Sequence, residues 1–165
     1  MGKLYLKQEI PRIRGEVTFF DVYETEVYRS RSRGNSILMP LKYELLDVND
    51  QAVVGIFRTS AVLLAEYKVV DLIAGVDICK VRKKSCSSLS GVEITTTQGR
   101  YSIDGSIWYQ KFEIFDEEGR KVIHMQKKKL EWGNTYEVTI NTELIDRHFA
   151  AGIVLAVDCT YHTGN

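Results

Sequence analysis

Three runs of basic side chains are the residues of this sequence best suited to bind a ligand. Arginines alternate with serines over residues 29–33, and cations alternate again over residues 80–84. Because alternate residues of a strand share a face, each run would project its charges from one surface. Arginine suits bidentate contact with phosphate oxygens, and serine adds a hydrogen bond. The candidate ligand-binding residues are Arg29, Arg31, Arg33, Lys80, Arg82 and Lys84, with Lys127, Lys128 and Lys129 as a third run.

The basic runs have a second interpretation, because charges are routine on the solvated outer face of a sheet. Two functions therefore stay open. One is a non-enzymatic binding module for anionic phospholipid headgroups or another phosphorylated ligand, and the other is a scaffold that binds protein through loops or one end of a barrel. Clustering of Arg29, Arg31, Lys80 and Arg82 in space would favour the first function. An exposed apolar patch rimmed by polar residues would favour the second.

Catalytic motifs are missing from the sequence. It contains no P-loop, no G-x-S-x-G, no H-E-x-x-H and no C-x-x-C pattern. His148 and His162 bracket an apolar segment and would be about 21 Å apart on a helix, too far to share a metal ion. The sequence therefore predicts no enzyme, no cofactor and no metal site.

The cysteines and one aspartate could each be chemical or structural. Cys79 and Cys86 are seven residues apart. They form either a redox pair or two separate reduced thiols. The odd cysteine count favours reduced thiols, and Cys159 suits a small core position. Asp158 directly follows an apolar run. It is either a buried general acid or a carboxylate paired with an N–H group or a cation. The paired state is favoured, because buried carboxylates are normally paired.

Short turns are expected between the strands. An aromatic or β-branched segment ends in aspartate four times, at Asp21, Asp47, Asp71 and Asp116. These four carboxylates form either a metal or acid–base set or the caps of hairpin turns, and turn chemistry is the favoured interpretation. Gln98-Gly99 and Asp104-Gly105 are further expected hairpin turns.

Composition and periodicity predict a mainly β protein. The chain has 16 Val, 14 Ile and 11 Thr but only seven Ala. β-branched residues pack well on pleated surfaces, and segments such as 136–141 alternate apolar and polar side chains. Successive hairpins imply a long antiparallel meander, and closure into a barrel would remove its edges.

The C-terminal segment is the exception to the β pattern. Residues 149–157 are apolar on every side, which is typical of a helix buried all round. We expect this core helix over about 143–161, with Thr142 as its N-cap and acidic Glu143 and Asp146 in the first turn. Nine apolar residues are too few to span a bilayer, which needs about 20. The sequence predicts that the helix fills the inside of the barrel.

The chain resembles the LURP-one-related proteins, which share the tubby C-terminal-like fold with the phospholipid scramblases. The resemblance is carried by the opening residues 4–8, the segment 112–122 and the closing apolar segment 150–158. It is strongest to compact bacterial-type members. The resemblance implies a closed antiparallel barrel of about twelve strands around a central C-terminal helix. Tubby-type proteins bind phosphoinositides through surface Lys and Arg, although this sequence has no residue-level match to that lipid site.

Length and charge complete the expectations. The 165 residues fit a single domain over 1–165. The 22 basic and 22 acidic side chains cancel, which argues against a nucleic-acid partner. The first residues lack the apolar run of a signal peptide. We expect a cytoplasmic protein, peripheral at the membrane if the lipid hypothesis holds, whose partners are anionic headgroups or another protein.

Overall fold

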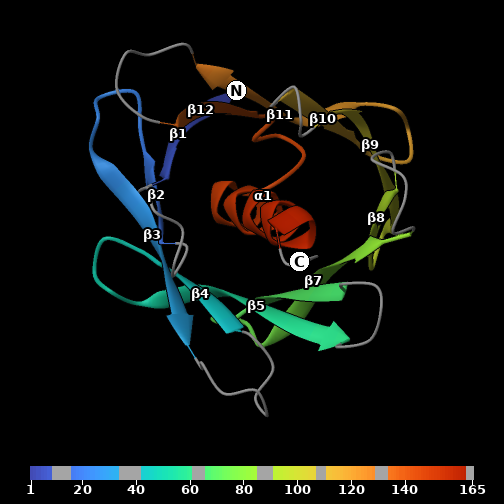
Figure 1. Ribbon diagram of the computed structural model, residues 1–165, viewed down its shortest axis with the longest axis horizontal. Helices are drawn as coiled ribbons and strands as arrows, with labels where there is room; N and C mark the ends of the chain where they lie inside the picture. The colour runs from blue at the N-terminus through green and yellow to red at the C-terminus, as the bar shows by residue number, and fades with distance from the viewer. Residues whose placement is uncertain are drawn as a thin grey trace.

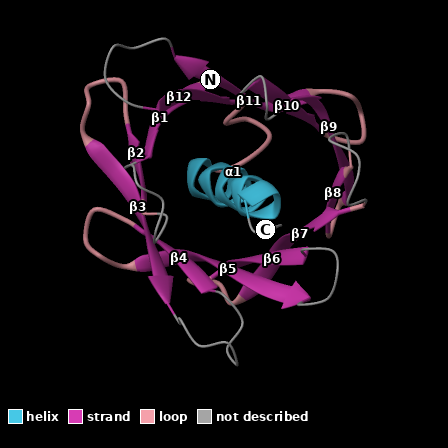
Figure 2. Ribbon diagram, in the orientation of Figure 1, coloured by secondary structure: helices cyan, strands magenta, loops and turns pink. Residues whose placement is uncertain are grey.

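The computed structural model is a closed antiparallel barrel of twelve strands around one helix, as the sequence and the family resemblance predicted. It describes residues 1–8, 16–33, 42–60, 66–84, 91–106, 111–128 and 134–162. Each strand pairs with its neighbours in the chain, and β1 closes the wall against β12. Figure 1 shows the wall surrounding α1, and Figure 2 shows that every element of the wall is a strand. The strands are β1 (Gly2–Gln8), β2 (Val17–Phe20), β3 (Glu26–Arg33), β4 (Lys42–Leu46), β5 (Ala52–Ser60), β6 (Glu66–Asp71), β7 (Val76–Lys83), β8 (Val92–Thr96), β9 (Gly99–Ser106), β10 (Lys111–Phe115), β11 (Lys121–Lys128) and β12 (Asn134–Ile140), and the helix is α1 (Arg147–His162).

Alternation along each strand divides the wall into an inner and an outer face. In β6, Tyr67 and Val69 are fully buried, whereas Glu66 and Lys68 are only partly covered. The inward Val, Ile, Leu and Phe side chains of the strands form one hydrophobic core with the residues of α1. Among the described strands, closure leaves none at an edge of the sheet, which is the physical advantage of a barrel for a meander of this length.

Helix α1 is buried on all sides because it lies inside this wall. Ala150, Ala151, Ile153, Val154 and Val157 have no exposed surface. The expectation that the apolar segment fills the barrel is therefore confirmed.

The helix begins at Arg147, later than the start near 143 that the sequence indicated. Thr142 is not its N-cap, and no acidic residue lies in its first turn. Asn141 forms a separate turn instead, because its Oδ1 accepts the backbone N–H of Glu143 and its carbonyl accepts that of Leu144. Asp146 stands directly before the helix, and its carbonyl accepts the N–H of Ala150. The turn formed by Asn141, one residue before Thr142, therefore takes the place of the expected first helical turn, and the helix starts later.

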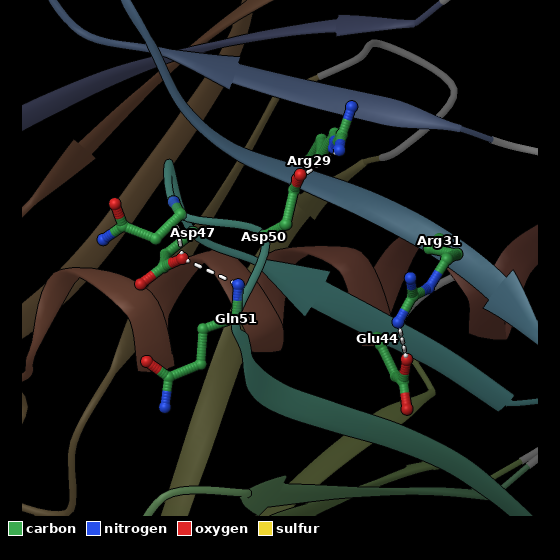
Figure 3. A network of polar contacts seen from close by, with 7 residues as sticks. Arg29, Arg31, Glu44, Asp47, Asp50 and Gln51 are labelled. Carbon is green, nitrogen blue, oxygen red and sulfur yellow. Dashed lines mark hydrogen bonds and ion pairs between the residues drawn. The ribbon is translucent and has the colours of Figure 1, made fainter.

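The four repeated aspartates are turn residues, as favoured from the sequence. In each turn one carboxylate oxygen accepts two backbone N–H groups, at distances of 2.8–3.1 Å. Asp47, for example, accepts from Asn49 and Gln51 at 2.9 Å each. Figure 3 shows the bond to Gln51. These side chains satisfy backbone donors that the strands leave unpaired.

Asp104-Gly105 is not a hairpin turn, so that expectation was wrong. Both residues lie within β9, where Gly105 pairs with Phe112 of β10. Gly105 has a φ of 113°, and a Cβ there would lie 2.5 Å from the carbonyl oxygen of Lys111. A glycine in a strand marks such a close approach of two backbones.

Candidate functional site

Arg29 and Arg31 of β3 lie on the outer side of the wall, and both already have anionic partners. Arg31 Nη2 lies 2.8 Å from Oε2 of Glu44, whose side chain is only 8% exposed. Arg29 forms an ion pair with Asp50, in the turn between β4 and β5. Figure 3 shows both pairs. Arg33 ends β3, and its side chain lies outside the described part of the structure. The described charges of this run are therefore largely neutralised within the protein.

The β7 cations are more available. Lys80 and Arg82 are exposed on either side of the fully buried Val81, so they share the outer face as the alternation predicted. Lys84 follows the strand, and its Nζ lies 4.0 Å from Glu93. Within the described residues, no carboxylate lies within ion-pair distance of Lys80 or Arg82.

The third run ends β11. Lys128 Nζ lies 3.0 Å from Oε2 of Glu137, and its hydrogen bond lowers the pKa of Glu137 below the ordinary carboxyl value. Lys127 has no carboxylate within ion-pair distance among the residues the structure describes. Lys129 lies outside them.

The basic runs do not converge on one pocket. β3, β7 and β11 lie four strand steps apart around the wall, with three strands between each pair, and stand well apart in Figure 1. At about 4.8 Å per strand, four steps amount to about 19 Å along the wall. Arg29 and Arg31 therefore do not cluster with Lys80 and Arg82.

The three runs do share one end of the barrel. In an up-and-down meander the odd-numbered strands all run in the same direction, so β3, β7 and β11 all end at the same rim. We call this the basic rim and define it as the last three residues of each odd strand and the first three of each even strand. It carries 11 Lys or Arg against five Asp or Glu. The cations are Lys7, Arg31, Arg33, Lys42, Arg58, Lys68, Arg82, Lys83, Lys111, Lys127 and Lys128.

The opposite end of the barrel is acidic. We call it the turn end; its connections are residues 21–25, 47–51, 72–75, 97–98, 116–120 and 141–146. These six connections carry nine Asp or Glu and one basic residue, Arg120, a formal charge of −8 in a chain whose total is zero. The neutral composition therefore conceals a strong separation of charge along the barrel.

The remaining candidate residues are placed as structural groups. Cys79 and Cys159 are buried thiols that form no disulfide, and burial raises the pKa of the Cys79 thiol to about 12. Cys86 lies outside the described residues. His124 Nδ1 lies 2.9 Å from Glu113 in the wall, and His148 packs edge-on against Phe149. In the described ranges no three His, Cys, Asp or Glu side chains come together as a metal site.

Asp158 is half-buried and has an interaction partner, so it is not an isolated carboxylate. It lies near Tyr43, whose pKa is raised to about 12 by burial, with a smaller contribution from the charge of Asp158. Within the described part of the chain, no helix has the length and apolarity needed to cross a membrane.

Comparisons with known proteins agree with this architecture. A family model described as LURP-one-related matches residues 3–158. The fold is similar to an X-ray structure of a protein from Arabidopsis thaliana, with a TM-score of 0.68 and 14% sequence identity. That similarity covers 98% of this chain and 93% of the plant protein, and at this identity it shows the fold alone. No curated protein matches the sequence.

Proposed function

The chain belongs to the LURP-one-related family, and we propose that it is a non-enzymatic module that binds anionic, phosphate-bearing surfaces through its basic rim. One observation carries the proposal: three basic runs, far apart in sequence, all end at the same end of one barrel. The proposed contact residues are Arg33, Arg82 and Lys127 of the basic rim, with Lys80 and Lys84 next to it, before and after the end of β7. Arg29 and Arg31 contribute less, because Asp50 and Glu44 already neutralise them.

The spacing of the runs favours a planar surface over a small phosphorylated molecule. Runs about 19 Å apart along the wall cannot share one phosphate group, which spans only a few ångströms. A membrane leaflet presents many headgroups in one plane and can meet all three runs at once. We therefore propose an anionic bilayer surface as the ligand, which makes the protein peripheral at the cytoplasmic leaflet, where anionic lipids are concentrated.

The expected affinity is modest. A basic residue near an anionic surface contributes about 1 kcal/mol, so five such residues supply about 5 kcal/mol, which corresponds to a dissociation constant of about 0.2 mM. Binding of this strength is reversible and sensitive to salt, because exposed charges are screened over about 8 Å at physiological ionic strength.

A role without catalysis fits the placement of the reactive side chains. Cys79 and Cys159 are buried, and burial raises their thiol pKa, whereas a nucleophilic cysteine needs a lowered one. His124 is held by Glu113 in the wall. Both arrangements suit packing and ion pairing.

Flotation with lipid vesicles tests the proposal. The protein is mixed with vesicles of phosphatidylcholine alone or of phosphatidylcholine with phosphatidylserine, at low and at physiological salt. We expect flotation with the anionic vesicles only, decreasing as salt rises. Soluble inositol hexakisphosphate, added as a competitor, should displace little of the bound protein if the ligand is a plane. Complete displacement would show instead a site for a soluble phosphorylated ligand.

The matched control is a cation away from the rim. Arg120 lies in the β10–β11 turn at the turn end, its side chain is 53% exposed, and its ion-pair partners Asp116 and Glu118 lie in the same turn. Arg82→Gln and Arg120→Gln remove the same charge, but only the first should weaken flotation. Equal loss in both variants would indicate a response to net charge alone, and absence of flotation at low salt would contradict the proposal.

A further inference from the structure

The turn end carries a cleft of about 410 Å³ beside the start of α1. Three segments line it: the start of β7, the β8–β9 hairpin, and the connection from β12 to α1 together with the first turns of α1. Ile78, Phe149 and Ile153 supply apolar surface, and Thr96 and Gln98 supply polar groups. The cleft is therefore amphipathic, with space for one or two side chains of a partner.

Among the described residues, three charged ones line the cleft, and all three are carboxylates: Asp77, Glu143 and Asp146. Asp77 is paired with Lys68 at 2.8 Å. In the described ranges no cation lies within ion-pair distance of Glu143 or Asp146. The positive end of the helix dipole, equivalent to about half a charge, offsets only part of these two. The cleft therefore favours a cationic group.

Apolar side chains are exposed around the same end. Within the described part of the chain, the large apolar residues that remain mostly exposed all lie at the turn end, and Tyr23 reaches 84%. Val76 also lines the cleft, and Ile73 precedes it in the β6–β7 turn. In the described ranges, the six large apolar residues that remain mostly exposed are Met1, Val22, Tyr23, Val48, Ile73 and Val76. Val76 therefore extends the apolar lining of the cleft to the exposed surface, and Ile73 lies three residues before it in the chain.

We propose that the turn end docks a segment of another protein that carries lysine or arginine beside apolar side chains. The basic side chain enters the cleft toward Glu143 and Asp146, and the apolar neighbours pack on Val76 and Ile73. Charge complementarity selects this occupant, since the nine acidic residues of the turn end repel anionic lipid. This site is at the opposite end from the basic rim, so it does not depend on the membrane proposal.

This inference is tested on the full chain by selection from a phage-displayed library of random twelve-residue peptides. The peptides recovered are synthesised, and their dissociation constants are measured by fluorescence anisotropy. We expect the recovered peptides to carry lysine or arginine beside apolar residues. They should bind the double variant Glu143→Gln/Asp146→Asn at least tenfold more weakly than the parent protein. Asparagine keeps a side-chain acceptor before the helix, so this variant should remain folded. The control Glu24→Gln/Glu26→Gln removes two exposed carboxylates of the same end outside the cleft and should bind normally.

Several outcomes would overturn the inference. Recovered peptides without basic residues, equal losses in both double variants, or failure to recover any peptide that binds the turn end would each do so. Head-to-tail association of the protein itself, seen by sedimentation and abolished by Glu143→Gln/Asp146→Asn, would replace the partner by a second copy of this chain. Flotation of these same variants on anionic vesicles separates the two proposals, because the cleft substitutions should leave it unchanged.

Discussion

Gly152 of α1 approaches Val54 of β5 so closely that a Cβ at position 152 would lie 2.7 Å from Cγ1 of Val54. Val69 of β6 would lie 3.3 Å away. The helix touches the wall here because residue 152 has no side chain. The close fit of α1 in the barrel thus depends on one glycine facing two β-branched residues that are stiff at χ1.

Gly152→Ala should therefore destabilise the protein, although alanine is favoured over glycine in a helix by about 1 kcal/mol. Overpacking of a tight core costs about 1–3 kcal/mol, and Val54 has little freedom to move. We expect a melting temperature lower by several degrees in calorimetry. The double variant Gly152→Ala/Val54→Ala should recover part of the loss. Stabilisation by Gly152→Ala would show that α1 is not held this closely.

The aspartate turns predict a graded response at Asp47. Alanine removes the oxygen that accepts two backbone N–H groups, so Asp47→Ala should cost about 1 kcal/mol in urea unfolding. Asp47→Asn keeps an acceptor oxygen and should cost clearly less. If the carboxylates were metal ligands instead, both variants would be equally affected and a chelator would lower the stability of the parent.

Glu137 predicts a dependence of stability on pH. The hydrogen bond from Lys128 lowers the pKa of this carboxyl in the folded state, and Lys3 adds a weaker attraction. The stabilisation is therefore fully present above the ordinary carboxyl pKa of about 4.3 and is lost as pH falls through the lowered native value. The difference in unfolding free energy between the parent and Glu137→Gln should be positive at neutral pH and shrink toward about pH 3. A difference independent of pH would contradict this.

The buried thiols predict slow alkylation. Cys79 and Cys159 are nearly inaccessible, and burial raises the pKa of both thiols. In the native protein at neutral pH, iodoacetamide should modify neither residue on the time scale on which it modifies the urea-unfolded chain. Mass spectrometry of proteolytic peptides identifies the sites. Rapid native labelling of Cys159 would mean that the end of α1 is not enclosed.

Much of the fold could be predicted from the sequence, because local chemistry determines it. Alternation in segments such as 136–141 predicted strands, and the apolar run at 149–157 predicted a helix buried on all sides. The start of that helix could not be found, because Asn141 competes with Thr142 through a side-chain bond that only the folded turn displays. Asp104-Gly105 resembled a turn because glycine occurs both in turns and at places where two backbones approach closely.

The candidate site was less predictable. Alternation placed Lys80 and Arg82 on one face, but no sequence pattern showed that Arg31 is paired with Glu44 across the ladder. The total charge of zero also hid the separation between the basic rim and the turn end. Strand direction alone reveals it, since it brings the last residues of β3, β7 and β11 to one end. The cleft was missed because its lining comes from three distant segments.

The most direct test of the account compares one charge from each basic run. Arg33→Gln, Arg82→Gln and Lys127→Gln, singly and together, are measured by partitioning onto phosphatidylserine vesicles at low salt. If one plane contacts all three runs, each single change should weaken binding about fivefold and the triple change about 150-fold, at about 1 kcal/mol per charge. If one substitution accounts for the whole loss, the ligand occupies a single local site. If none weakens binding, the basic rim is not the contact surface.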